Sequence, residues 1–170
     1  MPLTTYTAGE VLTAASLNAN FSFAAGGVVQ VKNAFITASF AATTTSFVDI
    51  TGLTISITPT SASNKILVMG SVNSGTANSQ QIITQLVRNS TVIGSGVNGS
   101  VWNGIMVNPS ENYQHMWTTP FMFLDSPATT SATTYKLQMA SSSGTSYINR
   151  RALDLIFGGS STITVMEVTP

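Results

Sequence analysis

Apolar and polar residues alternate along most of the chain, and from residue 28 onward the alternation has the period of a β-strand. It is cleanest at Leu53, Ile55 and Ile57, which are separated by threonine and serine. Such alternation turns one face of a strand toward a core and leaves the other face, here rich in hydroxyl groups, toward solvent. Short runs of this kind, separated by clusters of Ser, Thr, Asn and Gly, predict strands over residues 28–40, 47–57, 64–73, 80–88, 91–97, 101–107, 113–124, 133–140, 147–157 and 161–168.

Turn-forming residues separate these runs. Arg88-Asn89-Ser90-Thr91 lies between two apolar runs and predicts a hairpin turn, and Asp125-Ser126-Pro127 predicts a second break. A nucleotide-binding α/β fold would need repeated helices, which the pattern does not contain. We therefore expect an all-β fold, a jelly roll or β-sandwich of about eight to ten antiparallel strands, preceded by one short N-terminal helix.

The N-terminal residues follow a different pattern. Thr7-Ala8-Gly9-Glu10 has the Thr-x-x-Glu spacing of a capping box, so we expect a helix to begin there and to end at Gly26-Gly27. A helix of about 15 residues is marginal alone, so its apolar stripe must dock on a partner. We divide the chain into an attachment segment, residues 1–27, and a β-sandwich oligomerisation domain, residues 28–170. The expected docking residues are Tyr6, Val11, Leu12, Leu17 and Phe21.

Composition changes this picture in one respect. The 170 residues are 43% hydrophobic and only 7% charged, and their formal net charge is zero, whereas a typical soluble domain has about 25% charged residues. We infer that other copies of the chain, or a larger particle, cover much of the surface. A neutral chain also lacks the basic patch that nucleic acid requires, so no nucleic-acid partner is expected.

The sequence gives no sign of export or of membrane insertion. A secretory signal begins with positively charged residues, but the first ten residues here contain no Lys or Arg. Residues 11–31 are uncharged but are interrupted by polar residues and by Gly26-Gly27, which argues against a membrane span. The chain has no cysteine, which excludes disulfides and thiolate metal sites.

Residues with catalytic potential are present but isolated. His115 is the single histidine and has no partner at metal-ligand spacing, and no Gly-x-Ser-x-Gly elbow frames a serine. Residues 94–99 match a Gly-x-Gly-x-x-Gly pattern without the helix that should follow, which favours a surface loop. Arg150 and Arg151 are expected to point to opposite faces of a strand and to form no basic patch. The acids are scattered: Asp49, Glu111, Asp125, Asp154 and Glu167. We therefore expect no catalytic residue, no metal site and no cofactor, and a glycan hydrolase is the weakest hypothesis.

Aromatic residues gather between residues 102 and 117, close to several amide side chains. Aromatic rings can stack on sugar rings while amides bind hydroxyl groups, so a contact with a host glycan receptor is one interpretation. Packing in the core or between subunits is the other, and the pattern leaves both open. The candidate receptor residues are Trp102, Tyr113, His115 and Trp117.

Two stretches resemble proteins of bacteriophage particles. Residues 6–21, YTAGEVLTAASLNANF, resemble the leader of phage tail fibres, where it serves as the attachment or trimer-nucleating segment. The predicted strands at 47–53, 64–68, 134–138, 148–150 and 161–168 look like the trimeric jelly-roll modules of phage fibres, knobs and head-decoration proteins. The resemblance implies a fold, a homotrimer and a particle setting, but no catalytic motif.

These observations favour a structural component of a bacteriophage virion, assembled in the host cytoplasm. The leading hypothesis is a homotrimeric short fibre or knob that binds other virion proteins through residues 1–27. The alternatives are a capsid decoration protein and a receptor-binding tip that contacts a host surface glycan.

Overall fold

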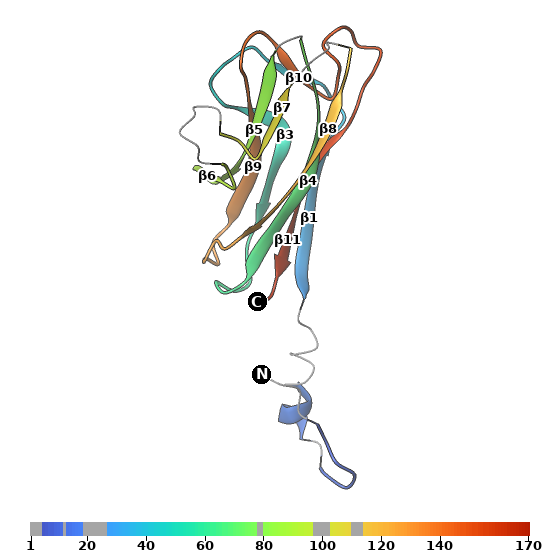
Figure 1. Cartoon of the computed structure of the whole chain (residues 1–170). Coiled ribbons are helices and arrows are strands. Elements are labelled where there is room, and N and C mark those ends of the chain that lie inside the picture. Colours follow the sequence, from blue (N-terminus) through green and yellow to red (C-terminus); the bar gives the residue numbers. More distant parts are fainter. Residues whose placement is uncertain (1–4, 12, 19–26, 78–79, 97–102, 110–113) are drawn as a thin grey trace.

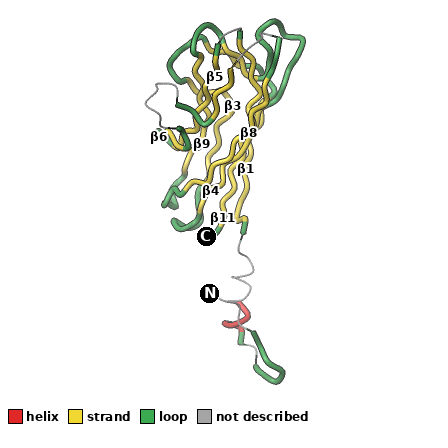
Figure 2. The backbone as a smooth tube through the Cα atoms, in the orientation of Figure 1, coloured by secondary structure: helices red, strands yellow, loops and turns green. Residues whose placement is uncertain are grey.

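The computed structural model describes residues 5–11, 13–18, 27–77, 80–96, 103–109 and 114–170. Residues 28–170 form an elongated sandwich of two antiparallel β-sheets, and the described part of the N-terminal segment lies beyond one end of it (Figure 1). Figure 2 shows the same path with helix, strand and loop distinguished.

Sheet A is built around β4 (Lys65–Thr76), the longest strand. Its order is β1-β11-β4-β10-β2, and β8 also pairs with β4. Ser74 pairs with both Ile148 and Trp117, so β10 and β8 occupy opposite edges of β4. The other strands are β1 (Val28–Ile36), β2 (Phe40–Ala42), β8 (Trp117–Asp125), β10 (Ser146–Ile148) and β11 (Ser161–Val168).

Sheet B has the order β3-β9-β5-β6, with β7 also paired to β5. The β5–β6 connection is the predicted hairpin: Arg88 pairs with Thr91, and Asn89 has a φ of 54°, a left-handed conformation that Asn tolerates better than most residues. The strands are β3 (Val48–Ile57), β5 (Gln81–Arg88), β6 (Thr91–Ile93), β7 (Met106–Pro109) and β9 (Thr133–Ser141).

The core lies between the two sheets and follows the predicted alternation. In β3 the side chains of Leu53, Ile55 and Ile57 are buried while the residues between them are exposed. Sheet A contributes its own inward residues, such as Ile66 and Val165, which are fully buried. Each such side chain contributes about 1.5–3 kcal/mol through burial, so the core accounts for the cohesion of the two sheets.

The predicted β-sandwich is confirmed, with differences in the bounds of several strands. In the described part of the strand expected over 101–107, pairing begins only at Met106, where β7 starts. The strand expected over 28–40 is split into β1 and β2, and the Asn149 side chain bridges the break by donating to the carbonyls of Ile36 and Ala38. The strand expected over 91–97 ends at Ile93, where Gly94 turns the chain with a φ of 68°. The strand expected over 147–157 was wrong beyond Ile148, as described below.

The helix also begins later than predicted. Thr7 to Glu10 form a turn in which the Glu10 carboxylate accepts the Thr7 amide at 3.1 Å, but Gly9 has a φ of 94° that no helix allows. The described helix spans residues 14–18. Thr13 caps it, because its hydroxyl oxygen accepts the Ser16 amide at 3.2 Å. The capping-box spacing thus marks a turn that begins at Thr7, whereas the residue that caps the helix is Thr13.

Candidate functional site

The outer face of sheet A carries several large apolar side chains that are exposed to solvent. Alternation along β1, β11, β4 and β8 turns every second side chain outward, and antiparallel pairing aligns these side chains in rows across the sheet. One row joins Val31 to Met166, Met166 to Leu67, and Leu67 to Leu124. The outer face comprises Val31, Asn33, Phe35, Lys65, Leu67, Met69, Ser71, Pro120, Met122, Leu124, Thr162, Thr164, Met166 and Val168.

Large apolar side chains on this face remain open to solvent. Met122 is 71% exposed, Phe35 60%, Val31 53% and Leu124 51%. Its single charged residue is Lys65, at one end, which donates to the Ser126 hydroxyl at 3.1 Å. Asn33, Thr162 and Thr164 form a hydrogen-bonded polar group within this face, and the large side chains around them are apolar. An exposed apolar surface of this kind marks an interaction surface.

A long loop crosses the upper end of the same face and replaces the strand expected over 147–157. β10 ends at Ile148 because Asn149 adopts a left-handed φ of 61° that turns the chain out of the ladder. The loop closes where Gly159 donates to the Asn149 carbonyl at 3.0 Å and Arg150 bridges to Gly158. We call residues 149–159 the 149–159 loop. It carries apolar side chains that are 47–76% exposed: Leu153, Leu155, Ile156 and Phe157.

Arg150 and Arg151 lie in this loop rather than on a strand, so the expectation that they point to opposite faces of a strand was wrong. The guanidinium of Arg150 lies 4.2 Å from the ring centre of Tyr147, and that of Arg151 lies 4.3 Å from the ring centre of Phe157. Arg151 also donates from Nε to Asp154 at 2.6 Å and makes a second bond to the same carboxylate. These contacts hold the loop in one conformation.

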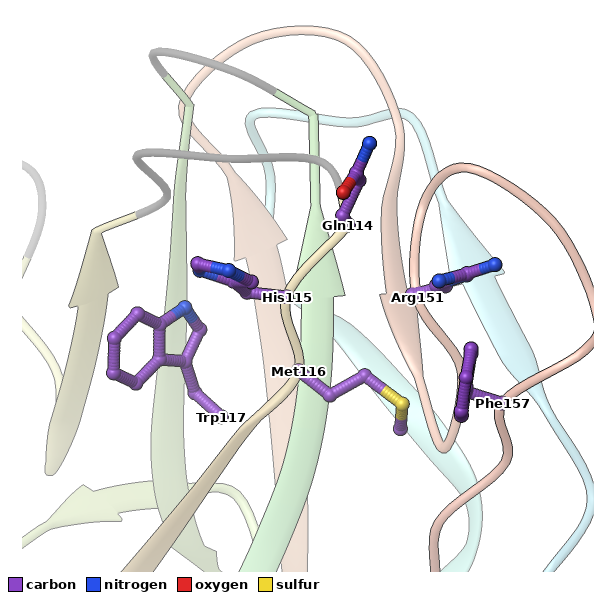
Figure 3. A pocket seen from close by; sticks show the side chains of 6 residues that line it. All are labelled: Gln114, His115, Met116, Trp117, Arg151 and Phe157. Atoms are coloured by element: carbon purple, nitrogen blue, oxygen red, sulfur yellow. The ribbon is translucent and has the colours of Figure 1, made fainter.

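A cavity of about 430 Å³ opens between the start of β8 and the 149–159 loop (Figure 3). We call it the distal cavity. Met116 points toward Phe157, and Arg151 lies beside that ring, whereas the side chains of His115 and Trp117 point to the other side of the strand. Its lining residues are Gln114, His115, Met116, Trp117, Arg151 and Phe157.

The candidate receptor residues are only partly brought together. His115 and Trp117 form an edge-to-face pair with ring centres 6.1 Å apart, and Trp117 is exposed, so this ring does not belong to the core. Trp102 and Tyr113 lie outside the described residues. The sequence pattern does not mark Arg151 and Phe157 as cavity residues, because it predicts a strand over 147–157. The signal for a loop is Gly158-Gly159 directly after the apolar run.

The expected docking residues lie in or near the N-terminal helix. Val11 is 83% exposed, Leu17 is 40% exposed, and Tyr6 is half-buried. Leu12 and Phe21 lie outside the described residues. The segment's described hydrogen bonds are local, apart from those of Gly27, whose amide and carbonyl bond to Thr169 where β1 and β11 meet.

The scattered acids have structural partners wherever they are described. Asp49 accepts from Lys136 at 2.8 Å and Gln138 at 2.6 Å, and hydrogen bonds from these residues lower the pKa of its carboxyl. Asp154 pairs with Arg151, whose hydrogen bonds lower the Asp154 pKa. Glu111 lies outside the described residues. The remaining two acids, Asp125 and Glu167, are buried in sheet A.

Asp125 joins the two sheets. Its carboxylate accepts from Arg88 at 2.8 Å and from the Tyr135 hydroxyl at 2.6 Å. Burial raises the pKa of Tyr135 far above its usual range, and the hydrogen bond to Asp125 adds to the shift. Tyr135 therefore stays protonated and keeps donating to the carboxylate. These two hydrogen bonds connect β5 and β9 of sheet B to the end of β8 in sheet A.

Two classes of feature are not found in the described part of the chain. No group of three or more His, Cys, Asp or Glu side chains is placed there to hold a metal ion. Its helical residues provide no stretch long and apolar enough to cross a bilayer.

Comparison with known proteins gives a likeness in fold. No family model and no curated protein matches the sequence. A chain from the structure of infectious bursal disease virus, Gx strain, superposes with a TM-score of 0.50 at 12% identity, over 84% of this chain and 33% of that chain. A chain of the VP2 subviral particle of infectious bursal disease virus gives a TM-score of 0.46 at 13% identity, with the same coverage of 84% and 33%. This chain therefore spans about a third of the length of the virus chain that it resembles, and shares with that part a β-sandwich fold.

Proposed function

We propose that this chain is a structural component of a virus particle. In this proposal it is a homotrimeric short fibre or knob whose sandwich self-associates through the outer face of sheet A. The observation that carries the proposal is the apolar, nearly uncharged surface of that face. The fold likeness to a chain from a virus structure supports the particle setting, and the trimer and the phage origin rest on the resemblance of the sequence to phage modules.

The size of the outer face suits contact between copies. Four strands about 4.8 Å apart, over seven residues of about 3.3 Å each, cover roughly 19 by 23 Å. The planar area is about 440 Å². The accessible surface is larger, because side chains protrude from the plane, and is therefore of the same order as the ~800 Å² that one partner contributes to a stable interface. Because only Lys65 is charged there, copies meet without repulsion, and apolar burial at about 25 cal/mol per Å² drives the contact.

The N-terminal segment is the proposed attachment to the particle. Val11 and Leu17 are exposed apolar residues on an element that stands apart from the sandwich (Figure 1). A helix this short gains stability only when another surface covers it. We propose other virion proteins as that surface, and the virion as the protein's location.

The proposal assigns the chain no catalytic role. The described acids Asp49, Asp125, Asp154 and Glu167 are engaged in ion pairs or hydrogen-bond networks that hold loops and strands. A general acid or base must instead reach a substrate proton. The structural contacts of these four acids are sufficient to explain their positions, and no catalytic role is needed.

Light scattering on two matched variants tests self-association. Leu124→Asp places a charge in the outer face, whereas Val92→Asp places the same charge at a site of similar exposure, 45%, on β6 of sheet B. We expect the wild type and Val92→Asp to be trimers at low and high salt, and Leu124→Asp to be monomeric. A monomeric wild type at both salt concentrations would overturn the proposal.

The position on the particle is a separate question. A capsid decoration protein would use the same face and the same segment as a short fibre or knob, so cryo-electron microscopy of the particle distinguishes the two. Density at the tail supports the fibre or knob, and density over the capsid lattice supports decoration.

A second candidate function is receptor contact at the distal cavity. The N-terminal segment leaves the sandwich where Val28, Val168 and Lys65 lie side by side, and the cavity lies where Trp117 pairs with Ser74. Nine residues of β4 separate these ends, a distance of about 30 Å. An anchored sandwich would thus direct the cavity away from the particle.

A further inference from the structure

The distal cavity combines an apolar wall with planar hydrogen-bond donors. Figure 3 shows the Met116 thioether directed toward the Phe157 ring, with the Arg151 guanidinium next to that ring. Phe157 is 55% exposed although it belongs to a loop that is tied down at its base and along its length. An exposed aromatic ring held in place is suited to receive the flat apolar face of a ligand.

Arg151 supplies polar contacts without supplying charge. The arginine fork has five N–H donors, and Asp154 accepts from two of them. Asp154 is itself fixed, because it also accepts the Ile156 amide at 3.0 Å. The pair is neutral as a unit, and Arg150, the other cation of the loop, lies over the Tyr147 ring and does not line the cavity. An anionic ligand in the cavity would therefore be attracted by Arg151 and repelled by Asp154 to a similar degree.

The volume limits the ligand to a small molecule or one end of a chain. Binding sites for small ligands commonly have volumes of about 300–1,000 Å³ and combine apolar walls with few polar groups. The distal cavity, at about 430 Å³, lies in the lower part of that range. It is open to solvent, so a longer ligand could continue outward.

We propose that the distal cavity binds a neutral sugar, one or two pyranose rings of an uncharged glycan. The apolar face of one ring lies against Met116 and Phe157, and its hydroxyl groups accept from the Arg151 guanidinium. The inference deepens the receptor-contact function proposed above, but sugar binding itself does not depend on the chain being part of a particle.

Titration of the full chain with defined sugars tests this inference. Saturation-transfer NMR and calorimetry with lactose, maltose and chitobiose as neutral probes, and with glucuronic acid and sialyllactose as acidic probes, measure affinity and selectivity. We expect at least one neutral disaccharide to bind at least tenfold more tightly than either acidic probe. Phe157→Ala should weaken that binding tenfold or more.

Two further variants separate loss of the site from loss of the fold. Leu155→Ala changes an exposed residue, 73%, of the same loop that does not line the cavity, and should leave affinity unchanged. Met116→Trp fills the cavity without removing apolar surface and should abolish binding while the melting temperature stays within a few degrees. Light scattering on the same samples reports self-association separately, so a failed trimer and a failed sugar site give different results.

Three outcomes would overturn the inference. Preference for an acidic probe would contradict the neutral pair, and equal binding by wild type and Met116→Trp would place the sugar elsewhere. Absence of binding by all three neutral probes at millimolar concentration would remove the site.

Discussion

Replacing Glu167 by glutamine tests whether a buried carboxylate, rather than packing alone, holds the lower end of sheet A. Glu167 is fully buried on β11. Its Oε1 accepts from the amide and hydroxyl of Thr60, both at 2.7 Å, and from Asn64 at 2.6 Å. Its Oε2 accepts from the Gln30 side chain at 2.6 Å. Glutamine keeps one oxygen but puts an amide group at the other position, where a donor then faces a donor.

The magnitude follows from the pKa of Glu167. Burial acts to raise the pKa, but the hydrogen bonds from Gln30, Asn64 and Thr60 outweigh it and lower the pKa from 4.5 to about 2. At 1.36 kcal/mol per pKa unit the full linkage is roughly 3 kcal/mol. Glutamine can keep its acceptor oxygen for Thr60 and Asn64, so we expect about 2 kcal/mol of this to be lost. Because the folded-state pKa is the lower one, this stability is present above pH 4.5 and is lost as the pH falls toward 2.

Urea unfolding of wild type and Glu167→Gln at a series of pH values measures the effect. We expect the variant to be about 2 kcal/mol less stable at pH 7, and the difference to shrink between pH 4.5 and pH 2 as wild-type Glu167 takes up a proton. Asp49→Asn is the control, because Asp49 is half-exposed and its ion pair with Lys136 is worth less than about 1 kcal/mol. A difference for Glu167→Gln that stays constant across this pH range would refute the reasoning.

Three other predictions concern the core, the loop and the N-terminal segment. Tyr135→Phe removes the hydroxyl that donates to buried Asp125, and should lower the free energy of unfolding by about 1–3 kcal/mol in urea titration; an unchanged value would mean that Arg88 alone satisfies the carboxylate. Ile163→Ala, at a fully buried position, should cost about 2–5 kcal/mol, whereas Ile156→Ala, at a position 76% exposed, should stay within about 0.5 kcal/mol by the same assay; equal losses would contradict the assignment of Ile156 to an open loop. Deletion of residues 1–26 should leave the circular dichroism spectrum and cooperative unfolding of the sandwich intact while abolishing incorporation into particles, and a deletion variant that fails to fold would show that the segment belongs to the core.

The strands could be predicted because their alternation reflects burial directly. Leu53, Ile55 and Ile57 have the same pattern in the sequence and in the structure, and β11 spans the predicted 161–168. The errors occur where backbone conformation rather than side-chain pattern ends an element. Asn149 and Gly94 take positive φ values that stop two ladders, and Gly9 does the same to the expected helix. Apolar periodicity contains no information about such turns.

The candidate site could be predicted only in part, because it depends on which strands become neighbours. The low charge of the sequence led us to infer that copies or a particle cover much of the surface, which remains a prediction. The sequence did not indicate that Val31, Met166, Leu67 and Leu124 form one row. That row requires the pairing order β1-β11-β4-β8, which local patterns do not specify. His115 and Trp117 were identified from composition, whereas their cavity partner Phe157 comes from a loop forty residues later.

The pairing of β1 with β11 has a consequence for the order of events during synthesis. Among the described strands, β1 leaves the ribosome first and β11 last, and β11 lies between β1 and β4 in sheet A. Until residue 168 has emerged, β1 and β4 cannot belong to one sheet, and the row from Val31 to Leu124 does not exist. A nascent or truncated chain that lacks β11 therefore cannot display the face through which copies would join. In the proposed trimer, assembly therefore waits until β11 has been synthesised.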